Sequence, residues 1–123
     1  MHIRLMTTLQ ELSGINEVHL IGKLGQHVFI KEMPSGDVLT TFTVIVPRSR
    51  KPRIGNQKVD SLACHTLKST IRTKVESWPA GSWVEIHGEL RRRFWQGGKG
   101  LGSATEIEVR TLIRMRESTS VNR

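Results

Sequence analysis

Short segments rich in β-branched residues dominate this chain and limit it to small β architectures. The longest is residues 38–46 (VLTTFTVIV), which stops at Pro47. Similar segments cover residues 18–24, 28–31 and 59–67, and most are closed by glycine or by turn residues. β-Branched residues between such breaks are typical of strands. The 123 residues are enough for one domain around a single core.

One segment follows a helical period instead. Its apolar residues are spaced by four, four and three positions, as on one face of a helix: Leu67, Ile71, Val75 and Trp78. Ser69 or Thr70 is expected to cap its start, and residues 79–81 (PAG) to end it. The alternating residues 83–95 then predict a fourth strand. Residues 96–102 predict a glycine-rich hairpin tip, and residues 104–115 a return strand.

This order of elements predicts an all-β fold, a five-stranded OB-fold Greek-key barrel with one short helix between strands three and four. Glycines inside the first strand help such a barrel to bend and close. An SH3-like barrel is the main alternative, but it offers no natural place for the helix. We expect a flexible leader over residues 1–14, the barrel domain over residues 15–116 and a disordered tail over residues 117–123.

The charge balance favours a polyanionic partner. Lys and Arg number 19 against 11 Asp and Glu, a formal charge of +8, and the pI is near 10.6. Such an excess points to nucleic acid first and to an anionic membrane surface second. The single cysteine, Cys64, suits a reducing compartment. Without a long apolar run or a signal-peptide pattern in the first 12 residues, we expect a cytoplasmic, nucleoid-associated protein.

The positive charge is concentrated in two segments that contain no acid, residues 48–58 and 91–99. Together they hold nine of the 19 basic side chains. Both are expected to protrude as a loop and a hairpin end, where they could hold phosphates. The basic candidates are Arg48, Arg50, Lys51, Arg53, Lys58, Arg91, Arg93 and Lys99, with Lys31 on the first strand. His65 joins them on the odd-numbered face of strand three, which we expect to line the groove.

The sequence RRRFWQGGKG (residues 91–100) places large aromatic side chains beside three arginines. If Ile86 and Leu90 point inward, strand alternation projects three side chains outward together: Arg91, Arg93 and Trp95. A bulge near Gly88 would exchange the two faces. An arginine beside an indole suits a nucleic-acid strand, because arginine neutralises phosphate while tryptophan stacks on a base. Phe29 and Phe94 are weaker stacking candidates, and Phe94 lies on the opposite face from Trp95.

The sequence offers little support for catalysis, and we predict no enzyme activity, no cofactor and no metal. The five histidines, at positions 2, 19, 27, 65 and 87, have no metal-ligand spacing with Cys64. Residues 97–100 (GGKG) lack the spacing of a phosphate-binding loop. Glu106 and Glu108 are interpreted as solvated surface carboxylates.

Several segments resemble the bacterial single-stranded DNA-binding proteins (SSB). They are residues 15–25 (INEVHLIGKLG), 33–36 (MPSG), 42–44 (FTV), 81–91 (GSWVEIHGELR) and 105–109 (TEIEV). The resemblance covers residues 15 to about 116. It implies an OB-fold that assembles as a homotetramer through pairing of first strands, with a dimer as the alternative. It also implies binding of single-stranded DNA without sequence preference in replication, recombination and repair.

The chain departs from the family pattern in its aromatic residues and its tail. Where the family usually has stacking aromatics, this sequence has Arg50, Ser61 and Leu67, and Trp95 alone matches a stacking position. Fewer stacking residues predict weaker binding or greater dependence on charge. Residues 117–123 lack the acidic, hydrophobic tip through which the family recruits other proteins. The pattern suggests an auxiliary paralogue or a shortened chain.

Two other functions remain open at this stage. One is a protein-interaction module similar to primosomal accessory proteins, in which Trp83 and Trp95 pack against a protein. The other is binding of single-stranded RNA, because nothing in the sequence selects against a 2′-hydroxyl. A membrane-surface role would need a basic amphipathic helix, and the predicted helix carries only three basic residues.

Overall fold

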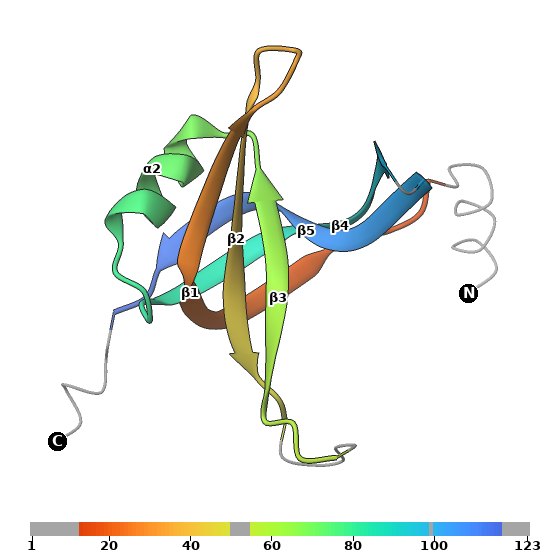
Figure 1. Ribbon diagram of the computed structural model, residues 1–123. Helices are drawn as coiled ribbons and strands as arrows, with labels where there is room; N and C mark the ends of the chain where they lie inside the picture. Colours follow the sequence, from red (N-terminus) through yellow and green to blue (C-terminus); the bar gives the residue numbers. More distant parts are fainter. Residues whose placement is uncertain (1–12, 50–54, 99, 117–123) are drawn as a thin grey trace, which may run out of the picture.

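The strands and the helix follow one another in the order that the sequence predicts. The computed structural model describes residues 13–49, 55–98 and 100–116. Its elements are β1 (Val18–Glu32), β2 (Val38–Pro47), β3 (Val59–Thr66), α2 (Ser69–Ser77), β4 (Trp83–Gly97) and β5 (Gly100–Arg114). Figure 1 shows β1, β2 and β3 side by side, with β4 and β5 crossing behind them and α2 at one side.

The strands close into a barrel in the order β1-β2-β3-β5-β4. All neighbouring pairs are antiparallel except β3 and β5, which pair parallel. The first half of β1 pairs with β4 and its second half with β2, with a register shift between Leu24 and Val28. The segments 18–24 and 28–31 that the sequence predicts are thus one long bent strand, which closes the barrel. The predicted five-stranded OB-fold, with one helix between β3 and β4, is confirmed.

The core fills the inside of the barrel with aliphatic side chains. The side chains that are almost fully buried include Val44, Val84, Ile86, Val109 and Leu112. On β2 and β4 they alternate with exposed or half-exposed residues, as expected for strands with one face toward the core. Burial of these apolar surfaces is the main source of the stability of such a barrel.

A register shift lies between β4 and β5 at His87 and Gly88. Gly88 pairs with Val109 and His87 pairs with Thr111, so the extra residue is Arg110 of β5. The alternation of β4 is therefore uninterrupted. Val84 and Ile86 face the core as predicted, whereas Leu90, which was expected to point inward, is 47% exposed. The two strands approach closely here, because a Cβ at Gly88 would collide with the backbone carbonyl of Glu108.

The helix differs from its prediction at its start. Lys68 is the N-cap residue and makes no side-chain cap bond, so neither Ser69 nor Thr70 caps the helix. Instead, the backbone N–H of Lys68 donates to Thr66 Oγ1 at 3.1 Å. Ile71 and Val75 are buried as predicted. Leu67 is exposed, because it lies in the connection between β3 and α2.

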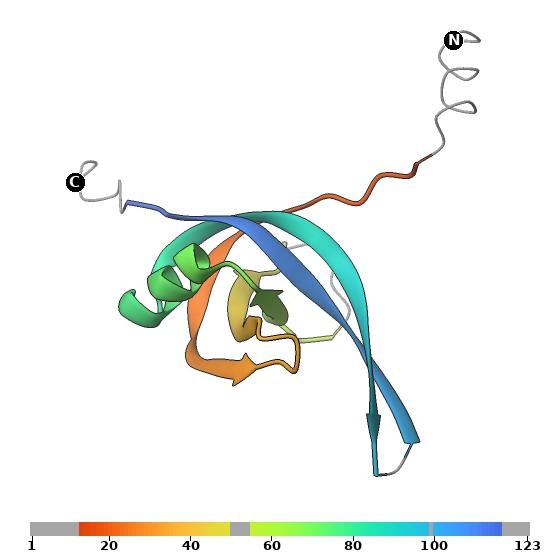
Figure 2. The same ribbon diagram turned by 90° about the horizontal axis from the view of Figure 1, so that it is seen from above.

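The β4–β5 hairpin is longer than predicted, since its strands continue into the glycine-rich stretch. Pairing extends to Gly97 opposite Gly100. Seen from above in Figure 2, β4 and β5 leave the barrel together as a two-stranded arm. No helix within residues 13–49, 55–98 and 100–116 is long and apolar enough to cross a membrane.

Candidate nucleic-acid interface

The outer face of the barrel carries a row of polar and aromatic side chains that crosses four strands. Phe29 of β1 is opposite Thr41 of β2, which is opposite His65 of β3. His65 is in turn the partner of Glu108 on β5. Directly opposite residues share a face, so this row lies on one surface.

The odd-numbered residues of β3 face this outer surface, as predicted. Ser61 and Ala63 are exposed, and His65 is partly buried. The neighbouring Cys64 points the other way into the core, where it is fully buried. Burial, and secondarily the charge of Glu106, raises the pKa of the Cys64 thiol to about 12. The thiol is therefore protonated and unreactive at neutral pH.

The β4–β5 arm continues the same surface and carries a tryptophan near its end. Trp95 is opposite Gly102 of β5, and its indole lies over that glycine. Because glycine has no side chain, the ring rests against the backbone and stays 45% exposed. The Arg93 guanidinium carbon lies 5.5 Å from the indole centroid, within cation–π range. The predicted pair of arginine and tryptophan is thus assembled on one face.

A carboxylate that the sequence places on the surface lies under this pair. Glu106 is only 7% exposed. Its Oε1 accepts from Arg93 Nε at 3.0 Å and its Oε2 from Arg93 Nη2 at 2.8 Å. His65 Nδ1 lies 2.9 Å from the same Oε1. Mainly the hydrogen bonds from Arg93, with help from His65, hold the pKa of Glu106 below its usual range. The prediction of a solvated Glu106 was wrong.

Arg91 is also held by carboxylates of the protein. Its guanidinium contacts Glu89 on its own strand, and its Nε donates to Glu108 Oε1 at 2.9 Å. Arg110, the bulged residue of β5, pairs with the second oxygen of Glu89. The segment 91–99 contains no acid, but β5 places acids directly beside its arginines. The grouping of charges along the sequence could not show these pairs, because Glu106 and Glu108 lie more than ten residues from the arginines that they contact.

The opposite face of the arm carries a second arginine–aromatic pair. The Arg92 guanidinium carbon lies 5.4 Å from the Phe94 ring centroid. Phe94 is 66% exposed, and Arg92 Nη2 contacts Ser103 Oγ at 3.3 Å. Arg92 is not among the predicted binding residues. Its position two residues before an aromatic is the signal that could have identified it.

The barrel itself adds an exposed aromatic pair at the second half of β1. Phe29 is 67% exposed, and the ring of His27 lies 6.2 Å from it, centroid to centroid, in a stacked arrangement. The sequence singled out Phe29 but not His27. Two positions of separation on one strand place both side chains on the same face.

The first basic segment is described only in part. Arg48 donates two hydrogen bonds to Asp60 Oδ1, at 3.0 and 2.8 Å. Lys58 and Lys31 are exposed and make no ion pair with the described residues. The remaining predicted phosphate ligands, Arg50, Lys51, Arg53 and Lys99, lie outside the described residues.

A closed five-stranded barrel of this topology, with one helix between β3 and β4, defines an OB-fold protein. The pattern of the Single-strand binding protein family matches residues 15–115. The chain therefore belongs to the Single-strand binding protein family.

The chain is similar to single-stranded DNA-binding protein 3 of Listeria innocua, with 27% identity over 86 residues. That alignment covers 70% of this chain and 54% of the relative, so the chain spans about half the length of that curated protein. The fold is similar to that of a Plasmodium falciparum SSB solved in complex with ssDNA. The TM-score is 0.68 at 24% identity, over 85% of this chain and 97% of the other.

Proposed function

We propose that this protein binds single-stranded DNA without sequence preference, through the outer face that runs from β1 to the β4–β5 arm. The observation that carries the proposal is the half-exposed indole of Trp95, seated on Gly102 beside Arg93. Any base offers a flat π-face to such a ring, so stacking holds a strand without reading its sequence. Membership of the Single-strand binding protein family and the Listeria relative support the same function.

The charges of the arm determine the affinity of the proposed site for the phosphates of a DNA strand. Arg91 and Arg93 already have carboxylate partners, so a phosphate must compete for them. Lys31 and Lys58, which have no such partner among the described residues, offer their charge directly. We therefore propose that phosphate contacts come mainly from Lys31 and Lys58, while Arg93 orients the indole.

We extend the proposal to the protein's role in the cell and to its oligomeric state. A binder of this kind would act in replication, recombination or repair, in the cytoplasm with the chromosome, and would perform no chemistry on the strand. We also propose homo-oligomers through pairing of first strands. In support, residues 18–22 of β1 pair with β4 on one side and have no strand partner on the other within the described chain.

The function is tested by titrating oligo-dT at two salt concentrations. We expect log affinity to fall with log salt by about 0.7 for each phosphate neutralised. Trp95→Ala should weaken binding by about fivefold or more, because stacking on one base contributes roughly 1–3 kcal/mol. Ile113→Ala, at an exposed position on β5 outside the proposed site, should leave affinity unchanged. An affinity that is independent of salt and equal in both variants contradicts the proposal.

A parallel titration of oligo-U distinguishes a preference for DNA from a preference for RNA. The indole and the lysines contact features that both polymers share, so the residues alone do not exclude RNA. Our proposal expects tighter binding of oligo-dT. Tighter binding of oligo-U would reassign the same surface to RNA.

A further inference from the structure

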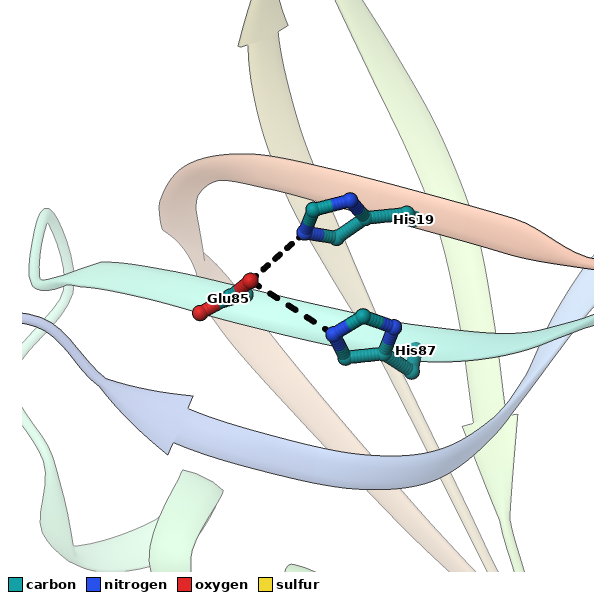
Figure 3. A group of neighbouring side chains, drawn as sticks. All are labelled: His19, Glu85 and His87. Atoms are coloured by element: carbon teal, nitrogen blue, oxygen red, sulfur yellow. Dashed lines mark hydrogen bonds and ion pairs between the residues drawn. The ribbon is translucent and has the colours of Figure 1, made fainter.

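A second cluster of functional side chains lies on the outer face of β1 and β4, apart from the arm. His19 of β1 is directly opposite His87 of β4, and Glu85 lies two residues before His87 on the same face. Figure 3 shows both imidazoles turned toward the Glu85 carboxylate. His19 Nε2 lies 2.6 Å from Glu85 Oε2, and His87 Nε2 lies 3.5 Å from the same oxygen.

The geometry concentrates three donor atoms in a small volume. The imidazole rings are stacked, with centroids 4.3 Å apart and planes inclined by 9°. The nearest donor atoms of the three side chains lie within 4.8 Å of one another. Zinc binds histidine nitrogen and carboxylate oxygen at about 2.0–2.2 Å in tetrahedral sites, so two donors on one ion lie about 3.3–3.6 Å apart. Tilting the rings and turning the carboxylate, with a change of about 1 Å in the widest separation, brings the donors to that geometry.

We infer that His19, Glu85 and His87 form a site for a divalent transition metal of the zinc class. Two imidazoles and one carboxylate are the ligands that such ions take in sites that keep a position open to solvent. Imidazole ligands favour zinc, copper, nickel or cobalt, whereas calcium and magnesium prefer all-oxygen sites. The site follows from the barrel, because β1 and β4 meet only through closure.

The surroundings allow the ligands to adjust. The His19 and His87 side chains are 54% and 48% exposed, so their rings can tilt with little disturbance of packing. Glu85 is half-buried, and its Oε2 lies within reach of both imidazoles, so the carboxylate faces the space between the rings.

The site is separate from the proposed nucleic-acid interface. Trp95 lies eight positions after His87 on β4, which corresponds to about 26 Å along an extended strand. Metal binding can thus be measured independently of DNA binding. A protein that fails to bind metal could still bind DNA as proposed, and a protein that fails to bind DNA could still bind metal.

The test measures zinc binding by calorimetry and cobalt binding by visible absorption, on the full chain after treatment with a chelator. We expect one zinc per chain and the absorption bands of nitrogen- and oxygen-ligated cobalt. His87→Gln, His19→Gln and Glu85→Gln should each weaken zinc binding by at least about tenfold. Circular dichroism verifies that each variant is folded.

Two histidines outside the cluster provide matched controls. His27→Gln removes an exposed histidine from the other half of β1, and His2→Gln removes the one beside the chain's start. Both should bind zinc within about twofold of the unaltered protein. Absence of zinc binding, or an affinity in all three cluster variants equal to that of the unaltered protein, would overturn the inference. So would a loss in the controls as large as that in the cluster variants.

Discussion

At the scale of single residues, the orientation of Trp95 depends on what lies beneath and beside it. Gly102 supplies a flat backbone surface, and Arg93 lies within cation–π distance of the ring. Arg93 is in turn fixed by two hydrogen bonds to the buried Glu106. A ring held in this way loses less conformational freedom when a base stacks on it, which is the general advantage of preorganisation.

Replacing Gly102 tests whether the seat of the indole matters. A Cβ at this position would lie 2.5 Å from the ring atom Cε2, so the indole must move away. We expect Gly102→Ala to weaken oligo-dT binding by about three- to tenfold, part of the value of one stacked base. Gly98→Ala is the control in the same hairpin, because its Cβ would meet nothing within 4 Å. Equal affinities of the two variants would argue against stacking on Trp95.

The buried Glu106 carboxylate predicts a loss of stability in acid. Its pKa is lowered in the folded protein, chiefly by Arg93, so the unfolded chain binds a proton more readily. The stabilisation is complete above the ordinary carboxyl value of 4.5 and is lost as the pH falls below it. At neutral pH we expect Glu106→Gln to reduce the free energy of unfolding by roughly 1.5–3 kcal/mol.

Thermal unfolding between neutral pH and pH 3 provides the measurement. The difference in midpoint between the unaltered protein and Glu106→Gln should shrink as the pH falls through this window. A difference that stays constant with pH would show that Glu106 contributes through packing rather than through its charge.

At the scale of elements, the arm formed by β4 and β5 combines charges that neutralise one another. Arg91, Arg93 and Arg110 are matched by Glu89, Glu106 and Glu108 on the same pair of strands. The exposed pairs made by Arg91 and Arg110 contribute little to stability, so their larger effect is to reduce the positive field that a phosphate meets. Affinity for a polyanion is thereby limited by the arm's own carboxylates.

Removing one of these carboxylates should strengthen DNA binding. Glu108→Gln breaks a partner contact of Arg91 and removes a negative charge from the face. We expect oligo-dT affinity to rise about two- to fivefold at low salt, with a salt slope steeper by up to about 0.7. Glu76→Gln, on the exposed side of α2, changes the net charge equally and should alter affinity by less than twofold. An equal rise in both variants would point to overall charge alone.

At the scale of the whole molecule, the barrel leaves the first half of β1 available for pairing on one side. Residues 18–22 of β1 have a strand partner on one side only, within the described chain. Unpaired edges favour pairing with another chain unless something blocks them. A second copy placed against this edge would extend the sheet across two barrels.

Assembly through this edge predicts two observations. The mass in solution, measured by light scattering, should be two or four times 13.9 kDa. Hydrogen exchange should show protection of consecutive amides over residues 18–22, because a strand paired on one side protects only alternate ones. A mass of one chain, with alternate protection, would exclude pairing of first strands.

Much of the fold could be predicted from the sequence because strand and helix periods are local properties. The apolar alternation of residues 83–95 and the stripe containing Ile71 and Val75 specify which side chains face inward, whatever surrounds them. The errors occurred at boundaries. Leu67 precedes the helix although it follows the helical period, and the hairpin tip is shorter than predicted, because pairing through glycines leaves no pattern in the sequence.

The sequence by itself determined the barrel class, the excess of positive charge and the shared face of Arg91, Arg93 and Trp95. Only the tertiary structure decided which groups meet them: Glu106 under Arg93, Gly102 under Trp95, and His19 beside Glu85 and His87. Those contacts depend on the register between strands far apart in the chain. Register is set by closure of the whole barrel around its core, and no local window of residues contains that information.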